Sequence, residues 1–469
     1  MKFGGTSVAD ASRLRRVARL AADRLGAART AEGENAGGVL LVLSALAKVT
    51  DALFACGRAA KSGDEAGALK GLEDILDRHR AVADELFGTA MPAPVTAALD
   101  AARAELSSVL RGAALLREMP DRSLDLLVGR GELLSSALLA AFMGVPWVDA
   151  RTVLRTDSRF GSAQPRPEEI RKLAAERLLP LMGPGCIAVT QGYIGSDAAG
   201  AATTLGRGGS DYSASLFGAA IDASEIQIWT DVEGVLTCDP RIVPEARPVE
   251  VLGYDEAAEL AAFGAKVLHP STILPAVERG IPVTVRNSLL PKGRFTTISR
   301  EAASGRPVTA LASRGPVTVI TVKTPGMLGG AGFLARMFEA FGRRGVSVDL
   351  VSTSEVSVSV TVESGVPVEE IAHDLAAFAD VRIENDRAVI ALVGEQLRRT
   401  PGVAGRAFGA LCDINVEMIS LGANEINLSL VVARDKEVEV LRRLHAAFFG
   451  GGGDATCGDP PGGRKEGDS

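Results

Sequence analysis

The sequence predicts an α/β protein in which a mostly parallel sheet covered by helices is followed by two ferredoxin-like units in tandem. Three observations predict this arrangement. Uninterrupted apolar runs alternate with helical patterns in residues 1–300, which is typical of strands buried on both faces. Two later segments repeat each other at a constant offset. The chain has 469 residues, more than one hydrophobic core supports, so at least two domains are expected.

The predicted strands of the first part share continuous apolar character, and they are Val39–Leu43, Ile187–Thr190, Ile226–Trp229 and Val283–Val285. Between them, Asp10–Arg29 and Gly131–Met143 carry apolar residues at the spacing of helices. Parallel strands need long crossover connections, and helices of this length provide them. We therefore assign residues 1–300 to one domain with helices on both faces of its sheet.

The second part contains an internal repeat. Gly332–Val362 aligns without a gap on Gly402–Val432, so that Phe338 falls on Phe408, an offset of 70 residues. Each copy reads as a helix, a turn and two strands, and the second strand alternates apolar and polar residues. Chance similarity between two α/β segments is the alternative. We predict two modules, residues 314–388 and 389–449, each with one sheet face covered by helices.

Two segments are predicted to lie outside these domains. Arg300–Pro316 is the expected junction between the first domain and the repeated modules. Residues 450–469 are rich in Gly and Pro and otherwise polar, which predicts a disordered tail.

Composition excludes several classes of protein. A net charge of −7 argues against a general nucleic-acid binder. The five cysteines are scattered without a C-x-x-C pair, which indicates a reducing compartment and no zinc site. No apolar run reaches the roughly 18 residues of a membrane span, and the first residues lack the apolar stretch of a signal peptide. We therefore expect a cytoplasmic protein with no membrane, nucleic-acid or protein-bound metal partner.

Two glycine-rich segments can approach an anion closely. In Lys2-Phe3-Gly4-Gly5-Thr6-Ser7, the glycines leave room for a phosphate and the lysine can neutralise it. A Gly-Gly turn without a ligand is the alternative. In Leu205-Gly206-Arg207-Gly208-Gly209-Ser210-Asp211, several N–H groups can form an anion nest, Arg207 can grip a carboxylate, and Asp211 can hold a metal or orient a lysine. A plain flexible loop is the alternative here.

Further polar residues follow predicted strands or interrupt apolar stretches. Thr230 and Asp231 end a strand, where open α/β sheets bind ligands. Arg241 belongs to an Asp-Pro-Arg turn, for which capping is the alternative role. Lys266 stands in the apolar stretch Phe263–Pro270, so either an anion lies nearby or its side chain reaches solvent. The P-loop, protein-kinase and dinucleotide motifs are absent from the sequence.

Taken together, the KFGGTS, GRGE, LGRGGSD, WTDV, TCDPR and FGAKVLHP segments resemble those of aspartate kinases of the amino-acid kinase family. The resemblance covers Lys2 to about Phe449, and the repeated units resemble two ACT modules. Residues 332–360 are most similar to the monofunctional, lysine-inhibited type. The resemblance implies an amino-acid kinase fold with two βαββαβ ACT modules. It also implies transfer of the ATP γ-phosphoryl group to the side-chain carboxylate of L-aspartate.

The resemblance also implies roles for individual residues. Lys2, Asp211 and Arg207 would be catalytic, with Lys2 the main cation at the transferring phosphoryl group. ATP, with Mg2+ held mainly by its phosphates, would be bound by Lys2, Gly4, Gly5, Thr230, Asp231, Leu236, Arg241, Lys266 and Val267. Aspartate would be bound by Ser44, Thr50, Glu132, Arg207 and Ser210. An effector, with L-lysine the leading hypothesis, would be bound by Met327, Ser347, Val348, Asp349, Ser354 and Glu355.

This chain departs from the family pattern at three places. Lys2 directly follows Met1 where relatives have a few strand residues, so either the first strand is short or the start is misplaced. Leu236 stands where the lysine-inhibited type tends to have a tyrosine, and Gly329-Gly330 replaces a His-Ser pair. Threonine, or no effector, therefore remains an alternative to lysine.

Two other functions are alternatives to aspartate kinase. Another amino-acid kinase would generally lack the paired C-terminal modules and the FGAKVLHP segment. A catalytically inactive amino-acid sensor would not need the charged residues of the kinase half, which are retained. ACT-like modules commonly pair between chains, so a homodimer or higher homo-oligomer is expected.

Overall fold

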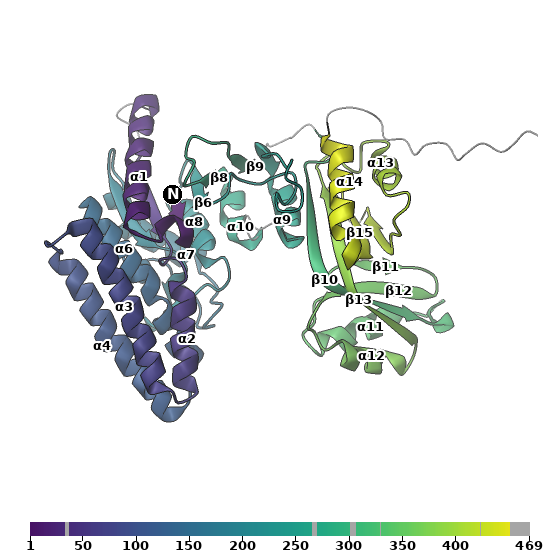
Figure 1. Cartoon of the computed structure of the whole chain (residues 1–469), viewed down its shortest axis with the longest axis horizontal. Coiled ribbons are helices and arrows are strands. Elements are labelled where there is room, and N and C mark those ends of the chain that lie inside the picture. Colours follow the sequence, from purple (N-terminus) through teal and green to yellow (C-terminus); the bar gives the residue numbers. More distant parts are fainter. Residues whose placement is uncertain (33–36, 265–269, 301–305, 329, 423, 451–469) are drawn as a thin grey trace, which may run out of the picture. The chain divides into compact units, whose positions relative to one another are not determined.

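The computed structural model describes residues 1–32, 37–264, 270–300, 306–328, 330–422 and 424–450 (Figure 1). The chain divides into two compact units. Unit 1 comprises Met1–Val235 and Val267–Ala302, and unit 2 comprises Leu236–Lys266 and Ala303–Ser469. Each unit is described by itself below.

Unit 1 is built on a mostly parallel sheet. Within this unit the strand order is β3-β2-β1-β6-β8-β9. The strands are β1 (Lys2–Phe3), β2 (Val39–Leu43), β3 (Ile187–Gln191), β6 (Ile226–Thr230), β8 (Val283–Asn287) and β9 (Thr296–Ser299). Only β9 runs antiparallel to its neighbour. A separate hairpin joins β4 (Ile194–Ser196) to β5 (Ala202–Thr204). All four predicted strands of the first part are confirmed.

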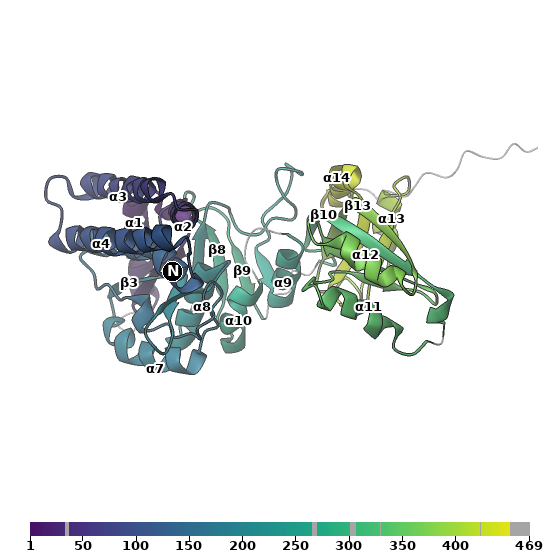
Figure 2. The ribbon, with the colours of Figure 1, turned by 90° about the horizontal axis from the view of Figure 1, so that it is seen from below.

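The helices of unit 1 are α1 (Ala11–Glu32), α2 (Val49–Lys61), α3 (Glu65–Phe87), α4 (Ala93–Leu116), α5 (Asp121–Val128), α6 (Arg130–Met143), α7 (Pro167–Arg177), α8 (Gly209–Ala220) and α10 (Pro270–Arg279). Both predicted helices of the first part are confirmed by α1 and α6. Local chemistry starts some of them: Asp64 caps α3 by accepting a hydrogen bond from the N–H of Gly67 at 2.9 Å. Figures 1 and 2 show α3 and α4 lying side by side.

The apolar stretch Asp121–Met143, which covers α5 and α6, is long and apolar enough to cross a membrane by length and composition alone. Two thirds of its most apolar window, 67%, is buried inside the protein. Leu127, Leu138 and Leu139 belong to the hydrophobic core that these helices share with β2 and α1. The burial explains the stretch as a core helix pair of unit 1.

Unit 2 is built on an antiparallel sheet of six strands in the order β11-β12-β10-β13-β15-β14. They are β10 (Ala310–Lys323), β11 (Val351–Thr353), β12 (Ser357–Glu363), β13 (Asp380–Val393), β14 (Met418–Leu421) and β15 (Asn427–Ala433). Unit 2 also contains β7 (Val251–Gly253), α9 (Tyr254–Ala262), α11 (Phe333–Gly342), α12 (Val368–Ala376), α13 (Val403–Ala410) and α14 (Glu437–Phe449). Separate core clusters lie beneath α11 with α12 and beneath α13 with α14.

The repeat predicted from the sequence is confirmed. Strand β12 spans residues 357–363 and β15 spans 427–433, so both ends differ by 70 residues. Helices α11 and α13 begin at Phe333 and Val403, again 70 residues apart. The two copies share one sheet because the 14-residue strands β10 and β13 lie side by side at its centre.

Two expectations about boundaries differ from the structure. The junction expected at Arg300–Pro316 is wrong in its second half, because Ala310–Arg314 already pairs with Val389–Val393 as part of β10. Leu236–Lys266 belongs to unit 2, since Glu256 on α9 accepts hydrogen bonds from the Thr309 hydroxyl at 2.6 Å and the Glu395 N–H at 2.9 Å. The domain limits 1–300, 314–388 and 389–449 stay predictions. The predicted disorder of residues 450–469 falls, beyond Gly450, outside the described residues.

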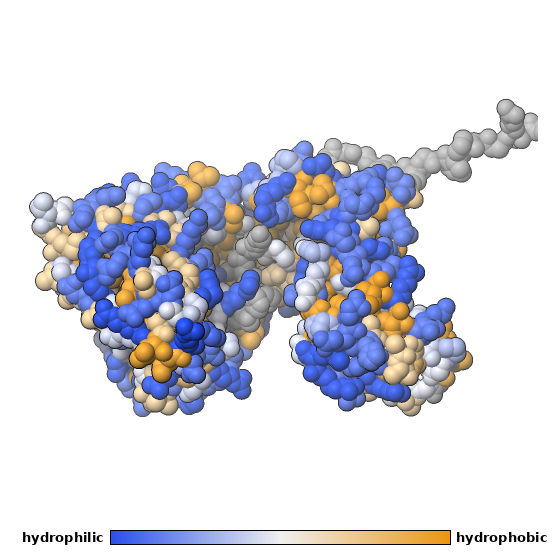
Figure 3. Space-filling model, turned by 60° about the horizontal axis from the view of Figure 1, so that its bottom comes forward, coloured by the Kyte–Doolittle hydropathy of each residue, from blue (hydrophilic) through white to orange (hydrophobic). Residues whose placement is uncertain are grey.

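The face of the molecule drawn in Figure 3 is mainly hydrophilic. Figure 3 shows one face on which polar residues dominate and hydrophobic residues form smaller patches. Such a surface agrees with a charged-residue content of 23%.

Candidate functional site

Four parallel strands of unit 1 end at the same level of the sheet. Phe3 is paired with both Leu43 and Trp229, and Leu43 is paired with Gln191. The residues that follow these strands, or end them, are Gly4, Ser44, Gly192 and Thr230. The carboxyl ends of parallel strands are where open α/β sheets bind ligands. Predicted site residues distant in sequence are thereby placed along one edge.

Lys2 and Asp211 form the central ion pair of this edge. Lys2 lies on β1 and is 8% exposed, and its Nζ is 2.6 Å from Oδ1 of Asp211 in the first turn of α8. A Cβ added to Gly4 would lie 3.5 Å from that Nζ, and one added to Gly5 would lie 3.2 Å from the carbonyl oxygen of Ala45. A side chain at Gly4 would therefore only touch the ammonium, whereas one at Gly5 would press on the backbone that follows β2.

The second glycine-rich segment connects β5 to α8. Gly206 and Gly208 have positive φ angles of 75° and 72°, which side chains rarely adopt. Gly192 packs so closely on this segment that an added Cβ would lie 2.8 Å from Cα of Ser210. The guanidinium of Arg207 is exposed, and no ion pair joins it to another described residue. A cation presented by a glycine-rich turn is available for an anionic ligand.

Glu132 is a buried carboxyl group with no cationic partner among the described residues. It lies near the start of α6, is 3% exposed, and its Oε2 atom accepts no hydrogen bond. Burial raises the pKa of this carboxyl to about 8, and hydrogen bonds from its own N–H and that of Ala45 only partly oppose the shift. An unpaired buried carboxyl beside the strand ends is suited to an ammonium group.

The segment that follows β2 contacts both β1 and α6. The Ser44 N–H donates to the Phe3 carbonyl at 3.1 Å, and the Ser44 carbonyl accepts from the Ser135 hydroxyl at 2.8 Å. Ser135 lies on α6, one turn after Glu132. Thr50 follows in the first turn of α2 and is half-buried. Ser44 therefore links β1 to the helix that carries Glu132.

Thr230 and Asp231 lie at the end of β6, next to β8. The Thr230 carbonyl accepts from the N–H of Ser288 at 2.8 Å, and Asn287 donates to the Asp231 carbonyl at 3.3 Å. The Ser288 hydroxyl also lies 2.8 Å from the Ser7 hydroxyl. The Asp231 side chain itself is exposed, and its Oδ1 accepts from the Thr230 hydroxyl at 3.2 Å.

Two supporting residues were not predicted from the sequence. Buried Asp125 on α5 accepts from the N–H and the hydroxyl of Thr204, both at 2.8 Å, and so fixes the end of β5 before the glycine-rich segment. Tyr193 has a positive φ of 70°, and its N–H donates to the Ser213 hydroxyl at 2.9 Å. Burial raises the pKa of the Tyr193 hydroxyl to about 12. An acidic residue within the apolar run Leu124–Val128 was the one sequence signal for Asp125.

The other residues predicted to bind the nucleotide are not among those described at these strand ends. Leu236 and Arg241 belong to unit 2, where Arg241 pairs with Asp239, Nε to Oδ1, at 3.0 Å. Lys266 and Val267 lie outside the described residues.

The predicted effector residues lie in unit 2, around the turn between α11 and β11. Asp349 is held by its N–H, which donates to the Thr361 carbonyl at 2.9 Å, and by Arg314, whose Nη1 is 3.1 Å from Oδ1. Its Oδ2 atom is buried and accepts no hydrogen bond from any residue that the structure describes. Burial raises the pKa of the Asp349 carboxyl despite the opposing charge of Arg314. This orphaned oxygen is suited to a cationic ligand.

The remaining effector candidates surround Asp349 in sequence. Met327 and Val348 pack against the core beneath α11, while Ser347 and Glu355 are exposed. The Ser354 hydroxyl lies 2.7 Å from that of Ser357. Among these residues, Asp349 alone combines burial with an unsatisfied charged atom.

Comparison with known proteins assigns both halves of the chain. Residues 1–287 match the amino acid kinase family, and residues 320–366 and 390–448 match the ACT domain. The lysine-sensitive aspartokinase 3 of Escherichia coli (strain K12) is 37% identical over 96% of this chain and 98% of its own length. The crystal structure of Escherichia coli aspartokinase III with aspartate and ADP (R-state) superposes with a TM-score of 0.79, at 36% identity over 96% of this chain and 99% of that one. Its complex with lysine and aspartate (T-state) gives a TM-score of 0.77, at 36% identity over 96% and 98% of the two chains.

The pKa of Glu132 predicts a pH dependence of stability. The folded protein holds this proton up to about pH 8, whereas the unfolded chain releases it near 4.5. The associated stability is fully present below pH 4.5 and is lost as the pH rises through about 8. We expect Glu132→Gln, which cannot ionise, to gain about 1–3 kcal/mol of unfolding free energy relative to the parent between pH 6 and 8, measured by urea denaturation without ligands. Parallel pH profiles for the two proteins would contradict the burial of an ionisable group here.

Proposed function

The chain belongs to the aspartokinases of the amino acid kinase family, and on that premise we propose that it transfers the γ-phosphoryl group of ATP to the side-chain carboxylate of L-aspartate. The observation that carries this proposal is the ion pair of Lys2 with Asp211, which joins the two glycine-rich segments at the strand ends, while the unpaired carboxyl of Glu132 lies on the helix that contacts Ser44 there. One cation at the phosphoryl group and one carboxyl for an ammonium are what this substrate pair requires.

Each end of aspartate finds a complementary group. Glu132 is suited to the α-ammonium, because the added positive charge compensates its buried carboxylate. The exposed guanidinium of Arg207 can grip the α-carboxylate, helped by Ser210 on the same turn. Ser44 and Thr50 would line the pocket between them. The side-chain carboxylate would then point toward Lys2.

The reaction needs alignment and charge neutralisation more than proton transfer. The aspartate side chain is already ionised at pH 7, so no general base is required. Two anions must be held together, and Lys2 neutralises charge on the transferring group. Asp211 holds the Lys2 ammonium in place at 2.6 Å. Gly4, Gly5, Thr230 and Asp231 would border the nucleotide, with Leu236, Arg241, Lys266 and Val267 contributing from the segments outside this edge.

Mg2+ would be held mainly by the nucleotide phosphates. Magnesium prefers oxygen ligands and keeps several waters, so it needs few protein groups. Among the described residues, no group of three or more His, Cys, Asp or Glu side chains is placed to hold a metal ion. Asp211 and Asp231 are carboxylates near the strand ends that would border such a metal. Bound Mg2+ would neutralise phosphate charge.

Feedback by L-lysine is proposed for unit 2. The buried, unsatisfied Oδ2 of Asp349 supports binding of an ammonium group there, and the lysine-sensitive relative shares this two-module organisation. Met327, Ser347, Val348, Ser354 and Glu355 would complete the site. We also propose that the protein works in the cytoplasm as a homodimer or higher homo-oligomer and supplies an early step of lysine, threonine and methionine synthesis.

A direct assay tests the activity. ATP, Mg2+ and L-aspartate are incubated with the protein, the acyl phosphate is trapped with hydroxylamine, and the assay is repeated with L-lysine. We expect aspartate-dependent hydroxamate that decreases with lysine. Hydroxamate that is indifferent to lysine would retain the kinase and reject lysine as effector. If no hydroxamate forms while lysine or threonine still binds by calorimetry, the sensor function replaces the enzymatic one.

Removing the Lys2 ammonium is expected to slow the chemical step. We expect Lys2→Met to lower kcat by roughly 10²–10³-fold while KM for either substrate changes much less, since the charge is most needed in the transition state. Steady-state kinetics with hydroxylamine trapping measures both constants. Lys172→Met, which changes an exposed lysine on α7, is the matched control. An unchanged kcat in Lys2→Met would remove Lys2 from the chemistry.

Arg207 is expected to act mainly on aspartate affinity. Loss of a charged hydrogen-bonding clamp corresponds to about 1.5–3 kcal/mol, so Arg207→Ala should raise KM for aspartate by ~10- to 100-fold. KM for ATP should remain near the parental value. Arg159→Ala removes an arginine that is 75% exposed in its side chain and serves as control. A KM for aspartate equal to that of the control would exclude the clamp.

Asp349 is expected to determine lysine sensitivity. Asp349→Asn keeps the shape but loses the charge, so the lysine concentration for half inhibition should rise by about tenfold or more. Uninhibited kcat should stay within about twofold. Glu363→Gln, which removes the other carboxylate paired with Arg314, is the matched control. Equal inhibition of all three proteins would place the effector elsewhere.

A further inference from the structure

A groove on the surface of unit 1 lies apart from the residues discussed so far. It has a volume of 440 Å³ and runs between α4 and α6 toward the segment that follows α6. Its floor consists of small apolar residues, and its lining residues include Ala98, Ala101, Leu133, Ala137, Ala141 and Val145. The volume falls within the range of about 300–1,000 Å³ that is usual for small-molecule sites.

The groove and Glu132 lie on opposite faces of α6. Arg130, Leu133, Ala137 and Ala141 line the groove at spacings of three and four residues, which places them on one face of the helix. Glu132 is two residues from Arg130 and therefore points to the other side. The groove is thus a separate site from the strand ends.

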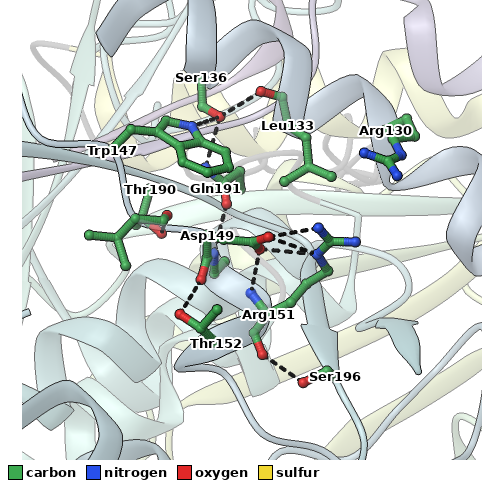
Figure 4. A network of polar contacts seen from close by, with 12 residues as sticks. Arg130, Leu133, Ser136, Trp147, Asp149, Arg151, Thr152, Thr190, Gln191 and Ser196 are labelled. Atoms are coloured by element: carbon green, nitrogen blue, oxygen red, sulfur yellow. Dashed lines mark hydrogen bonds and ion pairs between the residues drawn. The ribbon is translucent and has the colours of Figure 1, made fainter. Parts of the chain in front are cut away.

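An indole ring forms one wall of the groove and is held in a fixed position. Trp147 is 40% exposed, although its Nε1 donates to the Ser136 hydroxyl at 2.9 Å (Figure 4). Ser136 also accepts from Gln191 at 2.8 Å and donates to the Leu133 carbonyl at 3.0 Å. Because its N–H is occupied, the ring offers an apolar face to a ligand.

Two arginines also line the groove. Figure 4 shows Arg130 and Arg151 beside the Trp147 network. Arg151 uses Nε and Nη2 to bind Asp149, at 3.0 and 2.6 Å, which leaves Nη1 for another acceptor. Arg130 pairs with Glu105, yet its Nε is buried without a hydrogen-bond partner. Burial lowers the pKa of the Arg130 guanidinium, and the nearby charge of Arg151 lowers it further.

The charges define the ligand. Each guanidinium already has one carboxylate partner, so the four groups carry no net charge. The free Nη1 of Arg151 can bind one acid group, whereas a polyphosphate would find too few free donors and too little positive charge. The apolar floor and the indole face are complementary to a hydrophobic body. We propose that this groove binds a small amphipathic carboxylate whose acid group contacts Arg130 and Arg151 and whose apolar part lies on α6 and Trp147.

The test uses 4-phenylbutyrate as the probe and 4-phenylbutanamide, which lacks the charge, as its matched compound. Calorimetry with the full chain should give saturable one-to-one binding of the acid and at least about tenfold weaker binding of the amide. Arg151→Gln should weaken binding of the acid about tenfold, and Ala137→Phe, which fills the groove, should abolish it. Arg103→Gln removes an α4 arginine outside the groove that pairs with Glu73, and should bind as the parent does.

Circular dichroism and thermal unfolding show whether each variant folds. If Arg151→Gln does not fold, Ala137→Phe still tests the proposal. Three results would overturn the proposal: equal binding of acid and amide, no saturable binding of the acid, or undiminished binding in Ala137→Phe. Displacement of the probe by ADP with L-aspartate would place it at the strand ends and also overturn it. The proposal would also be overturned if the parent did not bind the probe and Ala137→Phe changed the oligomeric state. The groove would then be an interface between copies of the chain.

Discussion

The position of β1 between β2 and β6 is the constraint on which the candidate site depends. Only Lys2 and Phe3 form this strand, yet their pairing places the Lys2 ammonium at the level where four strands end. A largely buried ammonium needs a fixed counter-charge, and Asp211 on α8 provides it. This ion pair connects the start of the chain to the glycine-rich segment more than 200 residues later. Phe3 of β1 also stacks on Trp229 of β6, with ring centroids 5.8 Å apart. This contact in the core stabilises the pairing of the two strands.

Helix α6 connects several parts of unit 1. One face bears Glu132 and Ser135, which reach toward the strand ends, while the other lines the alanine-rich groove. Small residues on the second face leave an open volume where leucines would have filled the contact with α4. Burial of Glu132 without a partner is a cost to the ligand-free fold, and such costs are typical of sites prepared for a charged ligand.

The two repeats of unit 2 share one sheet. Central strands β10 and β13 each serve both copies, so neither copy has a complete sheet alone. The segment Leu236–Lys266 is held to this unit through Glu256 and through Thr237, whose hydroxyl lies 2.9 Å from Nε2 of buried His445. Leu236–Lys266 precedes the repeated modules in the sequence, yet residues of the modules hold it in place.

The sequence by itself determined the class of fold, the repeat and the residue types of the site. Apolar runs such as Val39–Leu43 and the 70-residue offset depend on local periodicity, which is readable without coordinates. Only the tertiary structure decided what depends on contacts between distant segments. It showed that β10 begins at Ala310 within the expected junction, that Asp125 supports the glycine-rich segment, and that Glu132 and Asp349 each have a buried oxygen without a described partner. Burial and hydrogen bonding are properties of the packed chain, and residue spacing alone does not encode them.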